Sequence, residues 1–569
     1  MKIRLPRDIV GVKFPKICTI DMNNFDIDLF LPALFFTILA EGRGKARQSN
    51  DPKAIAKFIN ALANHPDLIG FDDVEGRKVL ERLARTTLIT TGSVGRSHID
   101  EQITSIVPFT ILAHKPGFPV QGSRLRSADT FIYQVLRQHL GADDVLRSFV
   151  KTVFGRGVKI GSIAELGGTY DGETKLDTLT RLSIAFLDGF QNTRPGSKSR
   201  ENTVLGPCPV LAKELATDLY RYLFAYYNSM PTQAFTHHLL GLINFELFNY
   251  TLKLVHAVNE LVQNPDWLPG AMHDSEKISP PQLYLDFTDS SLSYSQEMAK
   301  ACVRRDIEAY QQFLLSSLLL RQLDHYVGDL KRSPSRRTEI ERILQSEESG
   351  AKYLQGLLLL RNDPVLGVSI DASARHDEDR IREANTNQAE ENNPDALDWL
   401  DAIVDTTEND VERVVNLLVE GQREGAIQHF IQWYWGVGGM KKPHGVLHGS
   451  LLSRKSWRYS PTNDLLAVLV QLAAARISGS SNQDRGEQKL QPIRLQDFLQ
   501  FLEKRFGIMI DRPPAPFEGA EYIAAARDNL RAMLGRLRQM GIFRDLSDDF
   551  TVQRLHPPYA SKEMTRVEI

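Results

Sequence analysis

The stretch TQAFTHHLLGLINFELFNYTLKLVHAVNELVQN, residues 232–264, decides the fold class of this chain. A helix drawn through it has about eight turns and carries apolar side chains on nearly every face. Such a helix lies in the middle of a bundle, because none of its faces prefers water. Its polar residues, among them His237, Glu246 and Lys253, argue against a membrane span and predict a buried helix in a globular protein.

Helical periodicity also dominates the rest of the chain. Apolar residues recur at helical spacing in segments 51–66, 128–141, 210–229 and 304–332, and the second of these ends at Gly141, a predicted C-cap. Strand-like pieces are few and short, and they fall at 2–5, 158–160, 282–287 and 365–370. We therefore predict a mainly α fold with a multi-helix body.

The composition fits a globular protein of several domains. The chain has 569 residues, of which 42% are hydrophobic and 24% charged, and its formal net charge is −3. Because the chain as a whole is not basic, any contact with nucleic acid must come from a local patch. Its three cysteines are far apart and show no C-x-x-C spacing, which argues against a disulfide framework or a cysteine-type zinc site.

The sequence also suggests where the protein resides. Residues 1–14 contain no apolar core of the kind that a secretory signal requires, and sparse cysteines suit a reducing compartment. We expect a cytoplasmic protein without a cofactor or a bound metal ion.

Changes in composition divide the chain. Residues 371–396 are polar, acidic and poor in large apolar side chains, so we expect an exposed, flexible insertion or linker. The predicted N-terminal helical domain covers residues 1–270, and a second helical region covers 271–370. The acidic insertion follows at 371–396, then a helical connector with a basic-aromatic loop at 397–459, and a winged-helix-like domain at 460–560.

The C-terminal region has the clearest modular pattern. Three helices are expected over residues 463–476, 494–507 and 521–541, the first with a cap and a proline at Ser460–Pro461 and the second ending at Gly507. Two short strands around the acidic turn 547–549 follow. Three helices followed by a hairpin are the order of a winged helix, a relative of the helix-turn-helix. The third helix carries Arg527 and Arg531 opposite its apolar stripe, where they can contact DNA or a protein partner.

A contact surface is predicted just before this module. Between Gly425 and Asn463 the sequence contains no aspartate or glutamate, whereas basic and aromatic residues alternate. Lysine and arginine neutralise phosphates and aromatic rings stack on bases, so this pattern is typical of contact with nucleic acid or a partner. The alternative is that the rings pack in the core while the cations are solvated. The candidate contact residues here are Lys441, Lys442, Arg454, Lys455, Trp457, Arg458 and Tyr459.

Catalytic patterns are weak. Asp171, Glu173 and Lys175 resemble part of a metal-dependent nuclease core, but the segment reads as a turn. His444 and His448 are four residues apart, yet the glycines and the proline around them prevent the helix that would bring both rings to one metal ion. We therefore predict no catalytic residues, and a divergent metal-dependent nuclease or other DNA-acting enzyme remains the alternative.

Residues 456–474, SWRYSPTNDLLAVLVQLAA, carry a resemblance to a known family. This cap and helix, between a large helical body and a winged-helix-like tail, resemble the accessory protein of bacterial methylation-associated anti-phage defence operons. The helical body is also similar to DptG-type accessory subunits of phosphorothioation-dependent restriction, which accompany HerA/FtsK-like ATPases. A more distant resemblance is to a Zorya component with a Glu/His signature, against which Glu424 and His444 can be set.

The resemblance implies a function without catalysis. We expect a subunit of a restriction-type defence complex that bridges an ATPase or nuclease partner and, in some arrangement, DNA. The implied partners are a HerA/FtsK-like ATPase or other proteins of the same operon, with no membrane involved. A sequence-specific transcriptional regulator is the third interpretation, and the acidic turn after the third helix disfavours it because aspartates repel phosphate.

Overall fold

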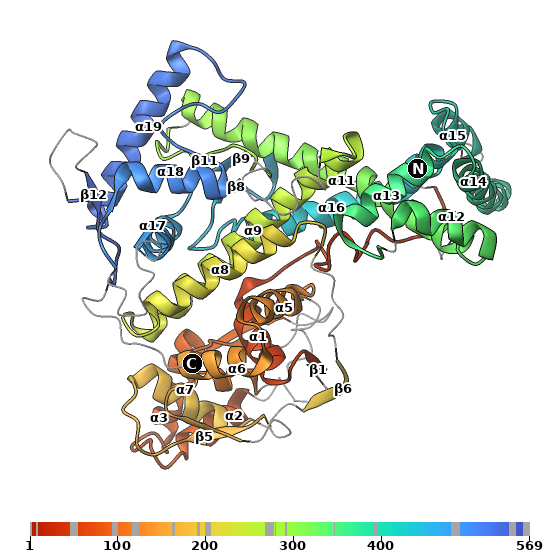
Figure 1. Cartoon of the computed structure of the whole chain (residues 1–569). Helices are drawn as coiled ribbons and strands as arrows, with labels where there is room; N and C mark the ends of the chain where they lie inside the picture. Colours follow the sequence, from red (N-terminus) through yellow and green to blue (C-terminus); the bar gives the residue numbers. More distant parts are fainter. Residues whose placement is uncertain are drawn as a thin grey trace.

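A computed structural model gives the fold of the chain. It describes residues 3–6, 9–45, 55–93, 101–115, 124–161, 166–190, 194–199, 206–267, 278, 280–290, 293–345, 347–391, 396–478, 490–544 and 553–560. These residues form a mainly helical protein with short two-stranded sheets, which confirms the mainly α part of the predicted fold class (Figure 1). None of the helices in these ranges is long and apolar enough to span a membrane.

Three long helices form the centre of the molecule. They are α9 (Thr232–Gln263), α11 (Tyr294–Leu330) and α16 (Asp410–Val437). α11 packs on both α9 and α16, and α8 (Pro209–Tyr226) packs on α9. Most residues of α9 are buried on all sides, as its sequence predicts. Two of its buried amides donate hydrogen bonds inside the bundle, Asn244 to the Val437 carbonyl and Asn259 to the Ala309 carbonyl.

The N-terminal region lies against one side of these helices, at the bottom of Figure 1. Its apolar helix α1 (Phe30–Leu39) is entirely buried between α5, α6 and a short 3-10 turn. Gly141 ends α5 in the left-handed conformation (φ 87°), as predicted for a C-cap. The other elements are η1 (Ile27–Leu29), β1 (Arg43–Lys45), α2 (Ile55–Ala63), α3 (Val74–Leu83), η2 (Ala84–Leu88), β2 (Ile89–Ser93), β3 (Glu101–Ile106), η3 (Ile111–His114), α5 (Ala128–Leu140), α6 (Asp143–Phe154), β4 (Val158–Ile160), β5 (Gly168–Tyr170), α7 (Thr178–Asp188) and β6 (Pro195–Ser199).

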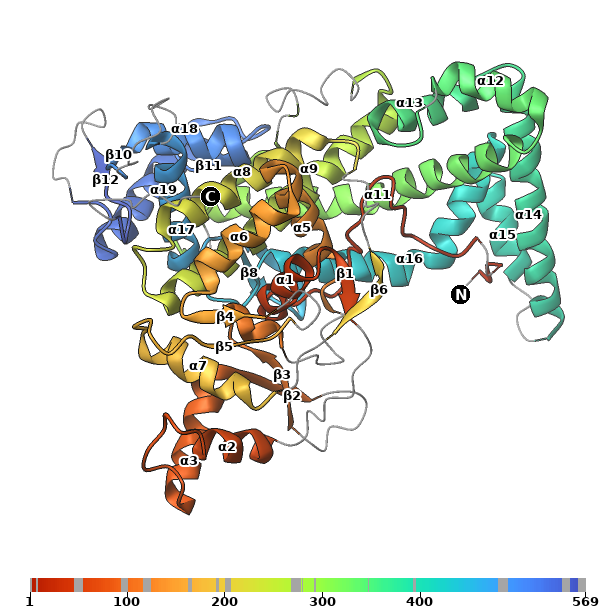
Figure 2. The same ribbon diagram turned by 60° about the horizontal axis from the view of Figure 1, so that its bottom comes forward.

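A helical arm projects from the far end of α11, on the right of Figures 1 and 2. It consists of α12 (Pro334–Leu344), α13 (Gly350–Arg361), α14 (Leu366–Glu391) and α15 (Ala396–Val404). Two predictions are wrong here. The expected strand at 365–370 is the start of α14, and the expected flexible linker is helical from 371 to 391, while residues 392–395 lie outside the described ranges.

The buried face of α14 explains both errors. Ile370, Ala374, Asp377, Ile381 and Asn385 follow one helical stripe and are all buried. Asp377 accepts hydrogen bonds from Gln322 and Tyr326 of α11, and Asn385 bonds the backbone of Arg4. The two polar members break the apolar pattern in the sequence, although partners from distant segments satisfy them in the fold.

The C-terminal region packs on the central helices and is not a detached module. It contains β8 (Leu447–Ser450), β9 (Ser453–Tyr459), α17 (Asn463–Ser478), β10 (Ile493–Arg494), α18 (Leu495–Phe506), β11 (Ile508–Met509), α19 (Ala520–Gln539) and β12 (Arg554–Leu555). β11 pairs in parallel with β7 (Leu283–Tyr284), which lies far away in sequence. Asn529 of α19 bonds the backbone on both sides of this pair, at Leu285, Phe287 and Ile510.

The first helix of this region covers the predicted segment, but its cap is not the predicted one. We predicted a cap at Ser460 and a proline at the first helical position, but α17 begins at Asn463. The Thr462 hydroxyl accepts the N–H of Leu465 and so has the capping role. The expected acidic turn 547–549 lies outside the described residues.

A buried ionic cluster joins this region to the body. The Arg505 guanidinium of α18 pairs with Asp218 at 2.7 Å, Glu246 at 2.9 Å and Glu214 at 3.3 Å. Burial lowers the pKa of Lys253, which lies beside them, to about 7, and burial raises the pKa of Glu246 well above its usual value. Removing one member of such a cluster leaves an unpaired buried charge, so the cluster fixes α8, α9 and α18 in one arrangement.

Candidate contact surface

The predicted basic-aromatic loop is a β-hairpin. β8 and β9 are antiparallel, with Leu447 opposite Tyr459 and His448 opposite Arg458, and only Leu451 and Leu452 connect the strands. Gly449 (φ 147°) forms an irregularity in β8, where a Cβ atom would lie 2.8 Å from the Trp457 ring. We call residues 444–448 and 456–459 the stem, and residues 450–455 the tip.

The stem is part of the core. Trp457 is 2% exposed and Tyr459 0%, and the Trp457 ring stacks on Tyr434 of α16 with ring centroids 6.3 Å apart. The Tyr459 hydroxyl lies 2.6 Å from the Tyr434 hydroxyl and donates to the Asp306 carboxylate at 2.6 Å. These two rings therefore hold β9 against α11 and α16, and they are not accessible for stacking on a nucleobase.

The buried carboxylate below the stem is fully used by the fold. Besides the Tyr459 hydroxyl, Asp306 accepts a hydrogen bond from Arg305 at 2.8 Å and lies 3.2 Å from His256 Nε2. Burial, together with this carboxylate, raises the pKa of Tyr459 well above its usual value. Since the tyrosines and the carboxylate are enclosed, the group serves to position β9 and offers no reacting atom to a substrate.

The seven predicted contact residues of this span separate into three groups. Trp457 and Tyr459 belong to the core. Two of the cations pair internally: Lys442 lies 2.5 Å from Asp28 of η1, and Arg458 lies 3.7 Å from the buried Asp286. The cations that remain at the surface, without a carboxylate partner in the described part of the chain, are Lys441, Arg454 and Lys455.

The tip is exposed and held in one conformation. Leu452 is 99% exposed and Leu451 42%. Ser456 accepts the N–H of Ser450 and donates to the Ser453 carbonyl, while Trp457 Nε1 donates to the Ser450 carbonyl at 2.7 Å. These bonds fix the turn, so the two leucines stand next to Arg454 and Lys455 on a rigid support. Because little conformational entropy is left to lose, such a tip is suited to binding.

The basic face of α19 lies at the surface as predicted from the pattern. Arg527 is exposed, and Arg531 is exposed and pairs with Asp528 one turn earlier at 2.7 Å. A neighbouring arginine that the sequence analysis did not single out has a structural part. Arg536 bonds the carbonyls of Phe287 and Pro461 and pairs with Asp289, so it anchors α19 to the segment that carries β7.

The candidate nuclease residues do not form a site. Asp171 follows β5 and accepts the backbone N–H groups of Glu173 and Thr174, both at 3.0 Å, as well as the Thr174 hydroxyl. These hydrogen bonds lower the pKa of Asp171 and close a surface turn. Among the described residues there is no group of three or more histidine, cysteine, aspartate or glutamate side chains that can hold a metal ion.

The two histidines of the loop lie in different environments. His448 is exposed on β8, whereas His444 is buried beside α9, with its ring centroid 5.8 Å from that of His237. Neither ring nitrogen of His444 has a hydrogen-bond partner in the described structure, and burial lowers its pKa to about 4. Glu424 is exposed on α16.

Comparison with known protein families gives a match to the chain. The family model described as methylation-associated defense system protein MAD7 matches residues 7–559, nearly the whole chain. No curated protein and no solved structure matches the chain.

Proposed function

The chain belongs to the MAD7 family of methylation-associated defence system proteins, and from this premise we propose that it is a non-catalytic subunit that bridges other components of the system. The observation that carries the proposal is the hairpin tip, where two exposed leucines and two cations without a carboxylate partner among the described residues stand on a rigid stem. Apolar side chains flanked by unpaired charge are a common feature of protein interfaces.

The partner that we propose is a HerA/FtsK-like ATPase or a nuclease of the same system. An acid-free span suits a negatively charged surface, either an acidic patch of that partner or the DNA on which it acts. Lys441, Arg454 and Lys455 are the cations that such a surface would meet, since Lys442 and Arg458 are paired within the fold.

The C-terminal region would supply a second contact. We infer a winged-helix-like docking module from the order α17, β10, α18, α19 and β12, in which Leu555 of β12 pairs with Ile493 of β10 and bridges to Phe543. Arg527 and Arg531 lie on the exposed side of its last helix. The tight packing of this region on β7 and α11 favours docking of a protein over a module that moves along DNA.

The test is purification from the complete operon. We expect the tagged wild-type chain to retain a partner. The amount of partner that co-purifies should fall at least tenfold in the double variant Leu451→Ser/Leu452→Ser and in the double variant Arg454→Glu/Lys455→Glu. The matched control is Val365→Ser/Val368→Ser, because these two valines are also exposed but lie on the arm. A wild-type chain that purifies alone, or tip variants that retain the partner as well as the control does, would refute the bridging role.

DNA is tested separately with the same proteins. Binding of a labelled duplex at increasing salt should weaken in the Arg454→Glu/Lys455→Glu variant, and the salt dependence should become shallower by about two phosphate contacts. If the tip variants lose the protein partner and bind DNA as the wild type does, the tip contacts protein alone.

A further inference from the structure

A second surface feature lies far from the hairpin, where the N-terminal segment crosses α11. Residues 9–16 and one face of α11 line an open cavity of about 350 Å³. Cavities that hold small molecules begin at about 300 Å³, so this one is large enough for a compact ligand. No residue of the hairpin or of α19 lines it.

The cavity carries an excess of positive charge. Lys13, Lys16 and Arg321 line it, against the single carboxylate of Asp324. Asp324 is already used, because it pairs with Lys16 at 2.7 Å and accepts the Tyr353 hydroxyl. Lys13 and Arg321 therefore remain without a neutralising partner in the described structure.

Arg321 is the informative member. Its Nη1 donates to the carbonyls of Ile9 and Gly11, and its guanidinium lies so close to Gly11 that a Cβ atom there would be 3.3 Å away. Burial lowers its pKa, and no carboxylate of the described residues opposes that effect. Among the described residues this half-buried cation contacts carbonyls and no carboxylate, so it has lost hydration, and an anionic ligand in the cavity would stabilise it.

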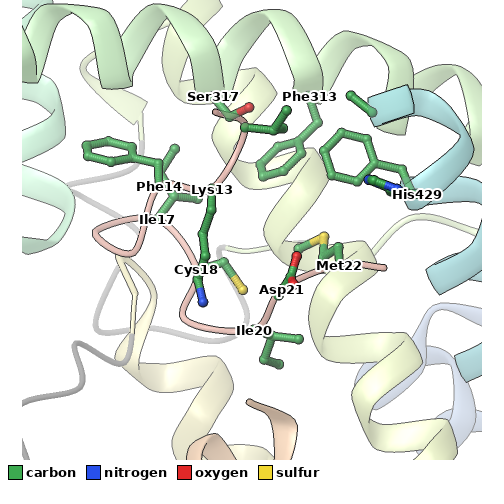
Figure 3. A pocket seen from close by; sticks show the side chains of 13 residues that line it. Lys13, Phe14, Ile17, Cys18, Ile20, Asp21, Met22, Phe313, Ser317 and His429 are labelled. Atoms are coloured by element: carbon green, nitrogen blue, oxygen red, sulfur yellow. The ribbon is translucent and has the colours of Figure 1, made fainter. Parts of the chain in front are cut away.

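A neighbouring pocket differs from this cavity in its lining and in its volume. It lies on the other side of Lys13 and Phe14, and its lining is mainly apolar, with the Cys18 thiol inside and Asp21 and His429 nearby (Figure 3). Its cavity is only about 60 Å³, which is room for one or two water molecules and not for a ligand. Burial raises the pKa of Cys18 to about 12, so this thiol is not a nucleophile at neutral pH.

We propose that the cavity between residues 9–16 and α11 binds a small phosphate-bearing anion of up to nucleotide size. The Arg321 guanidinium is pre-positioned by the two carbonyls, and the flexible Lys13 side chain closes on the phosphate from the exposed side. Phosphate is favoured over a carboxylate because a guanidinium and an ammonium together match its several oxygens. The inference does not depend on the proposed bridging role.

The experiment is calorimetric titration of the full chain with pyrophosphate and, separately, with ATP. We expect saturable binding at one site and a loss of at least tenfold in affinity in Lys13→Glu. Lys13 is exposed, so this variant should fold as the wild type does. The control is Lys352→Glu, which reverses an exposed charge on α13 and should leave the affinity unchanged.

Two results would overturn the inference. One is the absence of saturable binding of both probes by the wild type. The other is equal affinity in the Lys13→Glu and Lys352→Glu variants, which would mean that binding occurs elsewhere. A short single-stranded oligonucleotide serves as a third probe. Lys13-dependent affinity for the oligonucleotide, with no affinity for pyrophosphate or ATP, would contradict the small-anion site and assign these cations to nucleic-acid binding.

Discussion

The stem and the tip of the β8–β9 hairpin are a few residues apart and have opposite roles. Trp457 and Tyr459 are buried among α11, α16 and the strand itself, whereas Leu451 and Leu452 are exposed to solvent. In the sequence the tip leucines look like core residues, and the stem aromatics look like a contact surface. Residue type alone therefore does not decide whether a side chain is buried, because the strand register and the turn position determine which end of a hairpin is covered.

The largest expected effect separates the two ends by stability. Replacing Trp457 with alanine removes a buried ring that stacks on Tyr434 and donates to the Ser450 carbonyl, so we expect the free energy of unfolding to fall by about 3–5 kcal/mol. Urea denaturation measures it. Trp457→Phe keeps most of the apolar volume and loses the hydrogen bond, so it should cost about 1–2 kcal/mol. A loss below 1 kcal/mol in the alanine variant would show that the stem is not part of the core.

A smaller effect depends on pH and comes from His444, at the base of the stem. Its pKa in the folded chain is about 4, lowered by burial and then by His237 and Lys442, while Asp28 and Asp464 act in the opposite direction. The unfolded chain has the ordinary value near 6.5 and binds the proton first as pH falls. The contribution of His444 to stability is therefore complete above about pH 6.5 and is lost between pH 6.5 and pH 4.

The measurement compares wild type with His444→Gln. Because glutamine does not titrate, the difference between the two free energies of unfolding should change by about 2 kcal/mol in favour of the variant from pH 7 to pH 4.5. The comparison cancels the carboxylates that titrate in both proteins. A difference that stays constant across this range would mean that His444 reaches solvent and gains its proton in the folded state.

The sequence predicts the helical fold well where one chemical signal dominates. α9 is apolar on nearly every face, and Gly141 and Gly507 end α5 and α18 in the left-handed conformation as expected. It fails at α14, where Asp377 and Asn385 occupy a buried stripe and depend on partners from α11 and the N-terminal segment. Those partners are more than 50 residues away in sequence, so no local pattern contains them.

The candidate site is predictable in part for the same reason. The acid-free span locates the hairpin, but its sequence does not distinguish two kinds of cation. Lys442 and Arg458 pair with Asp28 and Asp286, whereas Arg454 and Lys455 have no carboxylate partner in the part of the chain that the structure describes. The carboxylates that neutralise the first two come from η1 and from the segment after β7. The cavity under residues 9–16 was not predicted at all, because it exists only where that segment meets α11.

The smallest expected effect on stability belongs to the tip, and it separates the role of the tip from that of the stem. Leu451→Ser/Leu452→Ser removes apolar surface that is mostly in water already, so the free energy of unfolding should change by less than about 0.5 kcal/mol. The same variant should lose the partner in the operon purification, because the leucines would be buried only in the complex. A variant that loses about 2 kcal/mol or more would show that the tip packs on the body, and its loss of binding would then report unfolding. Unchanged stability with lost binding would assign the tip to the interface and the stem to the core.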